Sequence, residues 1–126
     1  MLNTFETFFK ASDQLGDEWG HRWRASQRHR MQITLKLLKD NCSGVNSVLD
    51  LGCALGDFTR LVEEQFQCKE VHAVDIAHSA VAILKNKYPN WRVQQKALPE
   101  VPFEETKFDL VMAVEVINYL SPMQRL

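Results

Sequence analysis

The stretch VLDLGCALGDFT, residues 48–59, predicts a buried strand, a tight loop of small residues and the start of a helix. Gly52 and Gly56 stand where the strand turns into the helix. Glycine tolerates positive φ angles and lets a ligand approach the backbone closely. The helix predicted over residues 57–66 directs its first N–H groups and its positive dipole end toward this loop. The loop therefore suits a carboxylate or a phosphate.

A second strand, predicted over residues 70–75, ends in the carboxylate of Asp75. Together with the first loop it predicts a pocket for a nucleoside-containing cofactor. In this interpretation Asp75 accepts hydrogen bonds from two ribose hydroxyls, because a carboxylate is a bidentate acceptor. Its alternative role is to cap the following helix. Asp50, at the end of the first strand, either lies near the amino group of the cofactor or caps the turn.

The rest of the chain alternates helical and strand patterns, which predicts a doubly wound parallel sheet. Apart from the elements above, we expect helices over residues 22–40 and 78–87, and strands over 47–51, 91–95 and 108–116. The loop lacks the G-x-G-x-x-G pattern of dinucleotide sites and has the spacing D-x-G-x-A-x-G instead. That spacing argues against NAD or FAD, and an NAD-binding α/β enzyme is kept as an alternative.

The pattern resembles the first motif of the class I S-adenosylmethionine-dependent methyltransferases, (D/E)-x-G-x-G-x-G. Asp50, Gly52 and Gly56 match that motif, and Ala54 replaces its middle glycine. Asp75 matches the family's acid at the end of strand two. Residues 108–116, which begin with Phe-Asp, match its apolar strand four. The resemblance implies a Rossmann-like doubly wound parallel sheet and S-adenosylmethionine as the cofactor.

Several short stretches between residues 17 and 122 look closer still to the nodulation N-methyltransferase (NodS-like) family. They include DEW at 17–19, the arginine-rich stretch that runs to residue 30, AVDI at 73–76 and EVINYLSP at 115–122. Enzymes of that family methylate the amine of a chitooligosaccharide. The resemblance therefore implies a methyltransferase that acts on a small-molecule or sugar amine.

The resemblance also implies a set of site residues. The cofactor-binding residues would be Trp19, Arg22, Asp50, Gly52, Cys53, Ala54, Gly56, Asp75, Ile76, Gln95, Ala97 and Glu115, and the catalytic residues would be Glu115 and Tyr119. We expect no metal site. Several of these roles have structural alternatives. Glu115 attracts the methionine ammonium or orients the amine, or else makes a structural hydrogen bond. Tyr119 shapes the methyl path or is an exposed loop aromatic.

Adenine recognition departs from the family pattern, because no acid follows strand three, where methyltransferases often place one. The side-chain oxygen of Gln95 would accept from the adenine amine, and the Ala97 N–H would donate to a ring nitrogen. Ile76 would pack on the adenine face or in the core. Cys53 is expected to be a small filler rather than a nucleophile. Arg22, in a lid segment, would pair with the methionine carboxylate. Its alternatives are a solvated helix face and an RNA-facing basic patch from Arg22 to Arg30.

The bulk composition narrows the function classes. The chain has 126 residues, 45% hydrophobic and 25% charged, with a net charge of -1, so no basic field gathers nucleic acid or anionic lipid. No apolar run approaches the ~20 residues of a membrane helix. Three cysteines without a C-x-x-C pair are typical of reduced thiols rather than of disulfides or zinc, and they indicate the cytoplasm.

The predicted sheet is smaller than that of the family, which has seven strands. Residues 1–43 are expected to form a helical lid segment, and residues 44–126 the N-terminal half of a methyltransferase domain that stops after strand four. Strand four would then be an open edge, which is a pairing hazard. We expect that the chain truncates a longer parent or associates with a second copy along this edge. A cofactor-binding fragment that is inactive alone is the second alternative.

Overall fold

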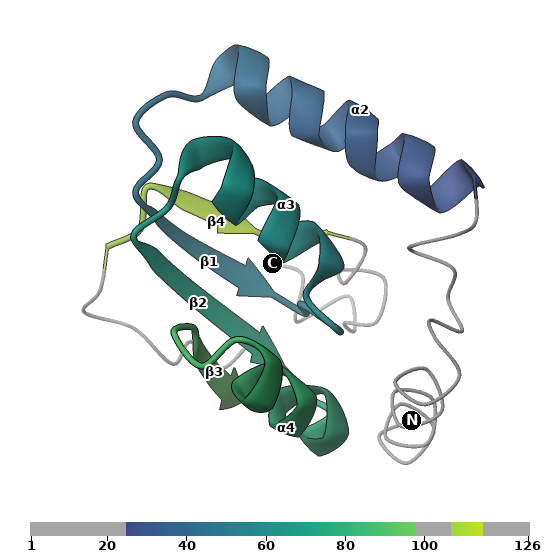
Figure 1. Cartoon of the computed structure of the whole chain (residues 1–126), viewed down its shortest axis with the longest axis vertical. Helices are drawn as coiled ribbons and strands as arrows, with labels where there is room; N and C mark the ends of the chain where they lie inside the picture. The colour runs from purple at the N-terminus through teal and green to yellow at the C-terminus, as the bar shows by residue number, and fades with distance from the viewer. Residues whose placement is uncertain (1–24, 98–106, 115–126) are drawn as a thin grey trace, which may run out of the picture.

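A computed structural model of the chain describes residues 25–97 and 107–114. Its elements follow one another as three helix–strand pairs and one further strand (Figure 1). Their bounds are α2 (Ala25–Asn41), β1 (Ser47–Leu51), α3 (Asp57–Phe66), β2 (Glu70–Asp75), α4 (His78–Lys87), β3 (Arg92–Gln95) and β4 (Leu110–Met112).

The strands form one parallel sheet in the order β3-β2-β1-β4. β1 lies at the centre and pairs with β2 on one side and with β4 on the other (Figure 1). Because the strands are parallel, the carboxyl ends of β1 and β2 meet at the same edge of the sheet. This arrangement confirms the predicted Rossmann-like α/β fold, with four parallel strands in the described part of the chain.

Four predicted elements have the expected bounds, namely β1, α3, β2 and α4. β3 begins at Arg92 rather than at residue 91, because Trp91 closes a turn by donating its N–H to the carbonyl of Tyr88. The prediction of a strand over 108–116 was too long. Pairing with β1 is confined to Leu110–Met112, and residues 113 and 114 are irregular.

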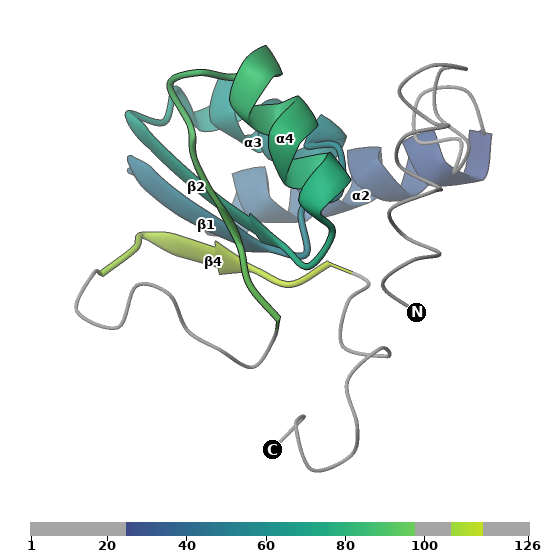
Figure 2. The same cartoon turned by 90° about the horizontal axis from the view of Figure 1, so that it is seen from below.

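The three described helices lie on the same face of the sheet (Figure 2). Alternate strand residues point into this layer and pack against the helices, with Val62 of α3 and Leu84 of α4 fully buried. The strand residues in this core are Val48, Val71, Ala73, Val93 and Met112. Such alternation follows from the two-residue period of a strand. The core therefore fixes both strand tips relative to α3 and α4.

The opposite face of the sheet is covered by no helix of the described part of the chain (Figure 2). Leu49, His72 and Val74 are nevertheless buried there, and the His72 ring meets Phe108 edge-on at 4.8 Å. Burial lowers the pKa of His72. Val111 of β4 is 54% exposed on the same face.

Helix α2 contributes the least to the core. Leu35 and Leu38 of this helix pack against the core, whereas Ile33 and Leu37 are exposed. No residue of α2 is buried. The predicted lid segment, residues 1–43, therefore stays a prediction, and its first 24 residues lie outside the described part. Within the described residues, no helix has the length and apolarity that a membrane span requires.

Candidate active site

The loop after β1 has the backbone that its glycines predict. Gly52 and Gly56 both have a φ of 77°, and Ala54 between them has a φ of 51°. The N–H groups of Gly52 and Cys53 donate to the carbonyl of Val74 at 2.7 and 3.1 Å. The loop is thus fastened to the end of β2, the strand that carries Asp75.

Asp75 completes this junction with its side chain. Its Oδ2 accepts the N–H of Ala54 at 2.9 Å, and its Oδ1 accepts the N–H of Ala77 at 3.0 Å. The first bond spans the two strand tips, and the second makes the local turn that leads into α4. The alternative role of Asp75 as a helix cap is only partly right, because the N-cap position of α4 is Ala77 and has no side-chain cap.

Asp50 is buried at the end of β1 and turns toward α3. Its Oδ2 accepts a 2.6 Å hydrogen bond from Oγ1 of Thr59, which is fully buried in the first turn of that helix. Burial raises the pKa of Asp50 to about 6, the Thr59 hydroxyl lowers it, and the charge of Asp75 raises it. The two carboxylates therefore act on one another. Sequence reasoning gave Thr59 no role, because the bond joins two elements and leaves no local pattern.

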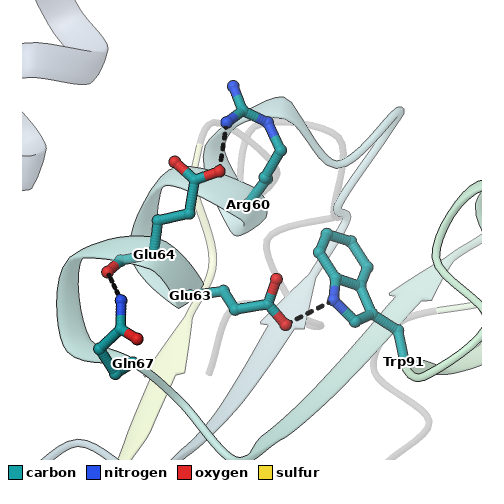
Figure 3. Close-up of polar contacts among 5 residues, drawn as sticks. All are labelled: Arg60, Glu63, Glu64, Gln67 and Trp91. Atoms are coloured by element: carbon teal, nitrogen blue, oxygen red, sulfur yellow. Dashed lines mark hydrogen bonds and ion pairs between the residues drawn. The ribbon is translucent and has the colours of Figure 1, made fainter.

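Gly56 also has a packing role, besides the cofactor-binding role expected of it. A Cβ atom there would lie 2.8 Å from Cδ2 of Leu84 and 2.9 Å from the Trp91 ring. Trp91 is held in place by its indole Nε1, which donates to Oε2 of Glu63 at 2.8 Å (Figure 3). Glycine is therefore required where α3 begins against α4 and the start of β3.

Cys53 lies in the same loop and is buried. Burial and the nearby carboxylates of Asp50 and Asp75 raise the pKa of its thiol well above the ordinary value. A thiolate is the reactive form of cysteine, so a thiol held protonated suits a filler and not a nucleophile.

The residues expected around adenine come together at the tips of β2 and β3. Asp75 pairs with Gln95 in the sheet register, and Nε2 of Gln95 donates to the carbonyl of Ile76 at 3.0 Å. Ile76 is 38% exposed, which argues against the alternative that it packs in the core. Ala97 is also exposed.

The other predicted site residues, Trp19, Arg22, Glu115 and Tyr119, lie outside the described residues. Within the described part, no group of three or more His, Cys, Asp or Glu side chains could hold a metal ion. The described part of the chain therefore brings together the predicted site residues that lie at the carboxyl ends of β1, β2 and β3.

Sequence reasoning also missed the role of Asp109, which lies at the other end of the sheet. Its Oδ2 accepts the N–H groups of Asn46 and Ser47 at 2.8 and 3.1 Å, and its own N–H donates to Ser47. Asp109, in the Phe-Asp pair that precedes β4, thus links β4 to β1 by hydrogen bonds, away from the site.

The comparisons with known proteins agree with this geometry. A family model described as a methyltransferase domain matches residues 48–126. The chain belongs to this family. It is 32% identical over 96 residues to a probable S-adenosylmethionine-dependent methyltransferase of Mycobacterium tuberculosis, covering 76% of this chain and 34% of the relative. The methyltransferase chain thus spans about a third of the length of the curated relatives that it matches.

Solved methyltransferase structures share the fold. The N-methyltransferase NodS from Bradyrhizobium japonicum WM9, in complex with S-adenosyl-L-homocysteine, superposes with a TM-score of 0.72 at 22% identity over 95% of this chain and 62% of NodS. An amino pentose methyltransferase from Micromonospora echinaspora, solved with S-adenosylmethionine, gives 0.64 at 16% identity over 91% and 44%. Together with the family match, these likenesses confirm the class I methyltransferase fold. They do not support the NAD alternative.

Proposed function

We propose that this chain transfers the methyl group of S-adenosylmethionine to a small-molecule or sugar amine. The observation that carries the proposal is the hydrogen bond from Ala54 to Asp75, which joins the two strand tips. Asp75 would accept the ribose hydroxyls. The loop from Gly52 to Gly56 would lie along the amino-acid end of the cofactor.

The remaining roles are assigned on the same basis. Gln95 and Ala97 would contact the adenine edge, and exposed Ile76 would cover its face. Glu115 and Tyr119 would stand where the sulfonium and the acceptor meet. Trp19 and Arg22 would belong to a segment over the cofactor. These assignments follow from the family pattern and from the neighbouring carboxyl ends of β2 and β3.

The chemistry asks the protein for alignment more than for covalent participation. The acceptor nitrogen attacks the methyl carbon, the carbon–sulfur bond breaks, and its electrons stay on sulfur to give S-adenosylhomocysteine. The nitrogen must be neutral to attack, and its proton leaves to water or to a carboxylate such as Glu115. Holding both partners in line can lower the barrier by about 7–11 kcal/mol.

An amine acceptor is favoured over other nucleophiles by the structural neighbours. NodS is named as an N-methyltransferase, and the second neighbour acts on an amino pentose. The net charge of -1 gives no reason to expect a nucleic-acid acceptor. Free thiols at all three cysteines suit the reduced cytoplasm, which we propose as the location.

A second candidate is a cofactor-binding unit that turns over only with further protein. It is favoured by the chain's span of about a third of its curated relatives. Methyl transfer and cofactor binding therefore need separate measurements.

Calorimetry tests the cofactor class directly. S-adenosylhomocysteine is expected to bind with one site per chain, and NADH is expected not to bind at the same concentrations. Binding of NADH alone would contradict the proposal.

Transfer of a labelled methyl group tests the acceptor class with a matched pair of sugars. Glucosamine offers a free amine, and N-acetylglucosamine offers the same ring with the amine blocked. We expect label on glucosamine only, at a rate that rises with pH as the amine loses its proton. Equal labelling of both sugars would exclude the amine as the acceptor atom. Cofactor binding without label on either sugar would favour the second candidate.

A further inference from the structure

A buried hydroxyl in the first turn of α3 faces the end of β1. Oγ1 of Thr59 donates to Oδ2 of Asp50 at 2.6 Å, and both side chains are buried. O–H···O⁻ bonds of about 2.5–2.7 Å are typical of a hydroxyl that donates to a charged carboxylate. The bond therefore joins a helix to a strand tip inside the candidate cofactor site.

This use of a helical threonine differs from that of Thr34, which serves as an internal comparison. In α2 the Thr34 hydroxyl donates to the carbonyl of Arg30 one turn earlier, at 2.8 Å. That backward bond is ordinary for a threonine within a helix. The Thr59 hydroxyl instead leaves its own helix for Asp50, so its direction is set by the carboxylate.

The other groups that act on Asp50 disfavour its charge. Burial has the largest effect, and the negative charge of Asp75 at the end of β2 adds electrostatic repulsion. Burial, and after it the same two carboxylates, raise the pKa of the Cys53 thiol in the loop between them, so the thiol stays neutral. The Thr59 hydroxyl opposes these effects and lowers the pKa of Asp50, which stands at about 6. Near neutral pH this hydroxyl thus favours the ionised form.

We propose that Thr59 is a positioning residue of the cofactor site, which holds Asp50 by Oδ2 so that Oδ1 meets the cationic amino-acid end of the cofactor. The inference rests on the proposed function. A hydrogen bond to one oxygen restricts the rotation of the carboxylate, and the carboxylate attracts an ammonium group only when it is ionised. Thr59 supplies both conditions without touching the ligand.

The test compares Thr59→Val, which removes the hydroxyl at nearly constant shape, with Thr59→Ser, which keeps it. S-adenosylhomocysteine is titrated calorimetrically into the full chain between pH 5.5 and 8. We expect Thr59→Val to bind about 10-fold more weakly near pH 7, the loss typical of a hydrogen bond to a charged group. The pH at which affinity is half its maximum should move above its wild-type value, and Thr59→Ser should restore both properties to within about threefold.

A double variant asks whether Thr59 acts through Asp50. If it does, adding Thr59→Val to Asp50→Asn weakens binding no further than Asp50→Asn alone. Additive losses would overturn the proposal. So would a Thr59→Val variant that is less stable but keeps the wild-type affinity and pH profile, because a purely structural hydroxyl predicts that result.

Two outcomes separate this inference from the proposed function. If the wild-type chain binds no S-adenosylhomocysteine at any pH, the proposed function fails and takes the inference with it. If the wild type binds and Thr59→Val binds identically, the inference alone fails. Should Thr59→Val not fold, Thr59→Ala takes its place under the same criteria. If neither folds while Thr59→Ser does, the hydroxyl is structural and the proposal is overturned.

Discussion

At the scale of single residues, Ala54 departs from the family motif in a way that carries a cost. The motif has glycine at this position, and Ala54 adopts a φ of 51°. An L-residue with a side chain pays about 1–2 kcal/mol in the left-handed region. Its N–H bond to Asp75 holds the alanine there.

Replacing Ala54 by glycine is expected to stabilise the chain. We predict that Ala54→Gly raises the free energy of unfolding in urea by about 1 kcal/mol, after allowance for the extra freedom of glycine in the unfolded chain. Ala82→Gly, on the exposed side of α4, is the control and should lower the free energy of unfolding by about 1 kcal/mol. Equal losses in both variants would show that Ala54 is unstrained.

The ionisation of Asp50 gives a prediction about pH. Its pKa of about 6 in the folded chain lies above the ordinary 3.8, so the folded state binds the proton more tightly. Stability from this group is therefore fully present below pH 3.8 and is lost as the pH rises through about 6. At 1.36 kcal/mol per pKa unit, the loss amounts to about 3 kcal/mol.

Urea unfolding of wild type and Asp50→Asn at pH 4, 6 and 8 measures this loss. The asparagine can still accept a hydrogen bond from Thr59 and carries no charge. The free energy of unfolding of Asp50→Asn should therefore rise relative to that of the wild type as the pH rises. Parallel pH curves for the two proteins would contradict the raised pKa of Asp50.

At the scale of elements, the start of α3 depends on the absence of one side chain. A Cβ at Gly56 would press on Leu84 and Trp91, which belong to α4 and to the turn before β3. Gly44 has a similar φ of 67°, but no atom lies within 4 Å of its would-be Cβ. Substitution at Gly44 therefore measures backbone strain alone, whereas substitution at Gly56 measures strain together with overpacking.

We predict that Gly56→Ala lowers the free energy of unfolding by about 2–5 kcal/mol, the sum of left-handed strain and overpacking. Gly44→Ala should lower the free energy of unfolding only by the backbone strain, about 1–2 kcal/mol. Urea unfolding of both variants gives the difference directly. Similar costs at the two positions would mean that α3 and α4 can separate to admit the methyl group.

The fastening of β4 to β1 by Asp109 predicts a second pH dependence, of opposite sign. Backbone N–H groups of Asn46 and Ser47 lower the pKa of Asp109 below 3.8. Its contribution is present above pH 3.8 and is lost as the pH falls through the lower folded value. Asp109→Ala should therefore unfold more easily than wild type at pH 7, and the gap should narrow in acid. A constant gap from pH 7 to pH 2.5 would argue against this role.

At the scale of the whole molecule, the described residues form a sheet with helices on one face and with β4 as an edge strand. Val111 is 54% exposed on the other face, within that edge strand. An exposed apolar edge strand is a template for pairing with another chain. We therefore keep the prediction that the chain self-associates along β4, unless further sequence covers this edge.

Sedimentation of the chain tests this prediction. A charged lysine at position 111 should disfavour strand pairing along β4. If the wild type associates, Val111→Lys is therefore expected to be monomeric. Ile33→Lys, which alters an equally apolar exposed residue on α2, should leave the association unchanged. A monomeric wild type, or equal effects of both lysines, would exclude association through β4.

The parts of this molecule that sequence predicts are those with local signals. Apolar residues at strand or helix spacing mark β1, α3, β2 and α4 within one segment each, and the motif residues 50–56 lie at the end of β1 and in the loop after it, as expected. The length of β4, the roles of Thr59 and Asp109 and the packing of Gly56 depend on partners in other elements. Asp109 lies 63 residues from Asn46, for example, and no period or spacing links them.

The central claim is that the tips of β1 and β2 jointly bind the adenosyl cofactor, and one calorimetric comparison tests it most directly. S-adenosylhomocysteine is titrated into wild type, Asp75→Ala and Glu70→Ala; the last removes an exposed acid from the opposite end of the same strand. We predict that Asp75→Ala weakens binding by about 10- to 100-fold, because charged hydrogen bonds are lost, and that Glu70→Ala binds like wild type. Unchanged affinity in Asp75→Ala would contradict the account.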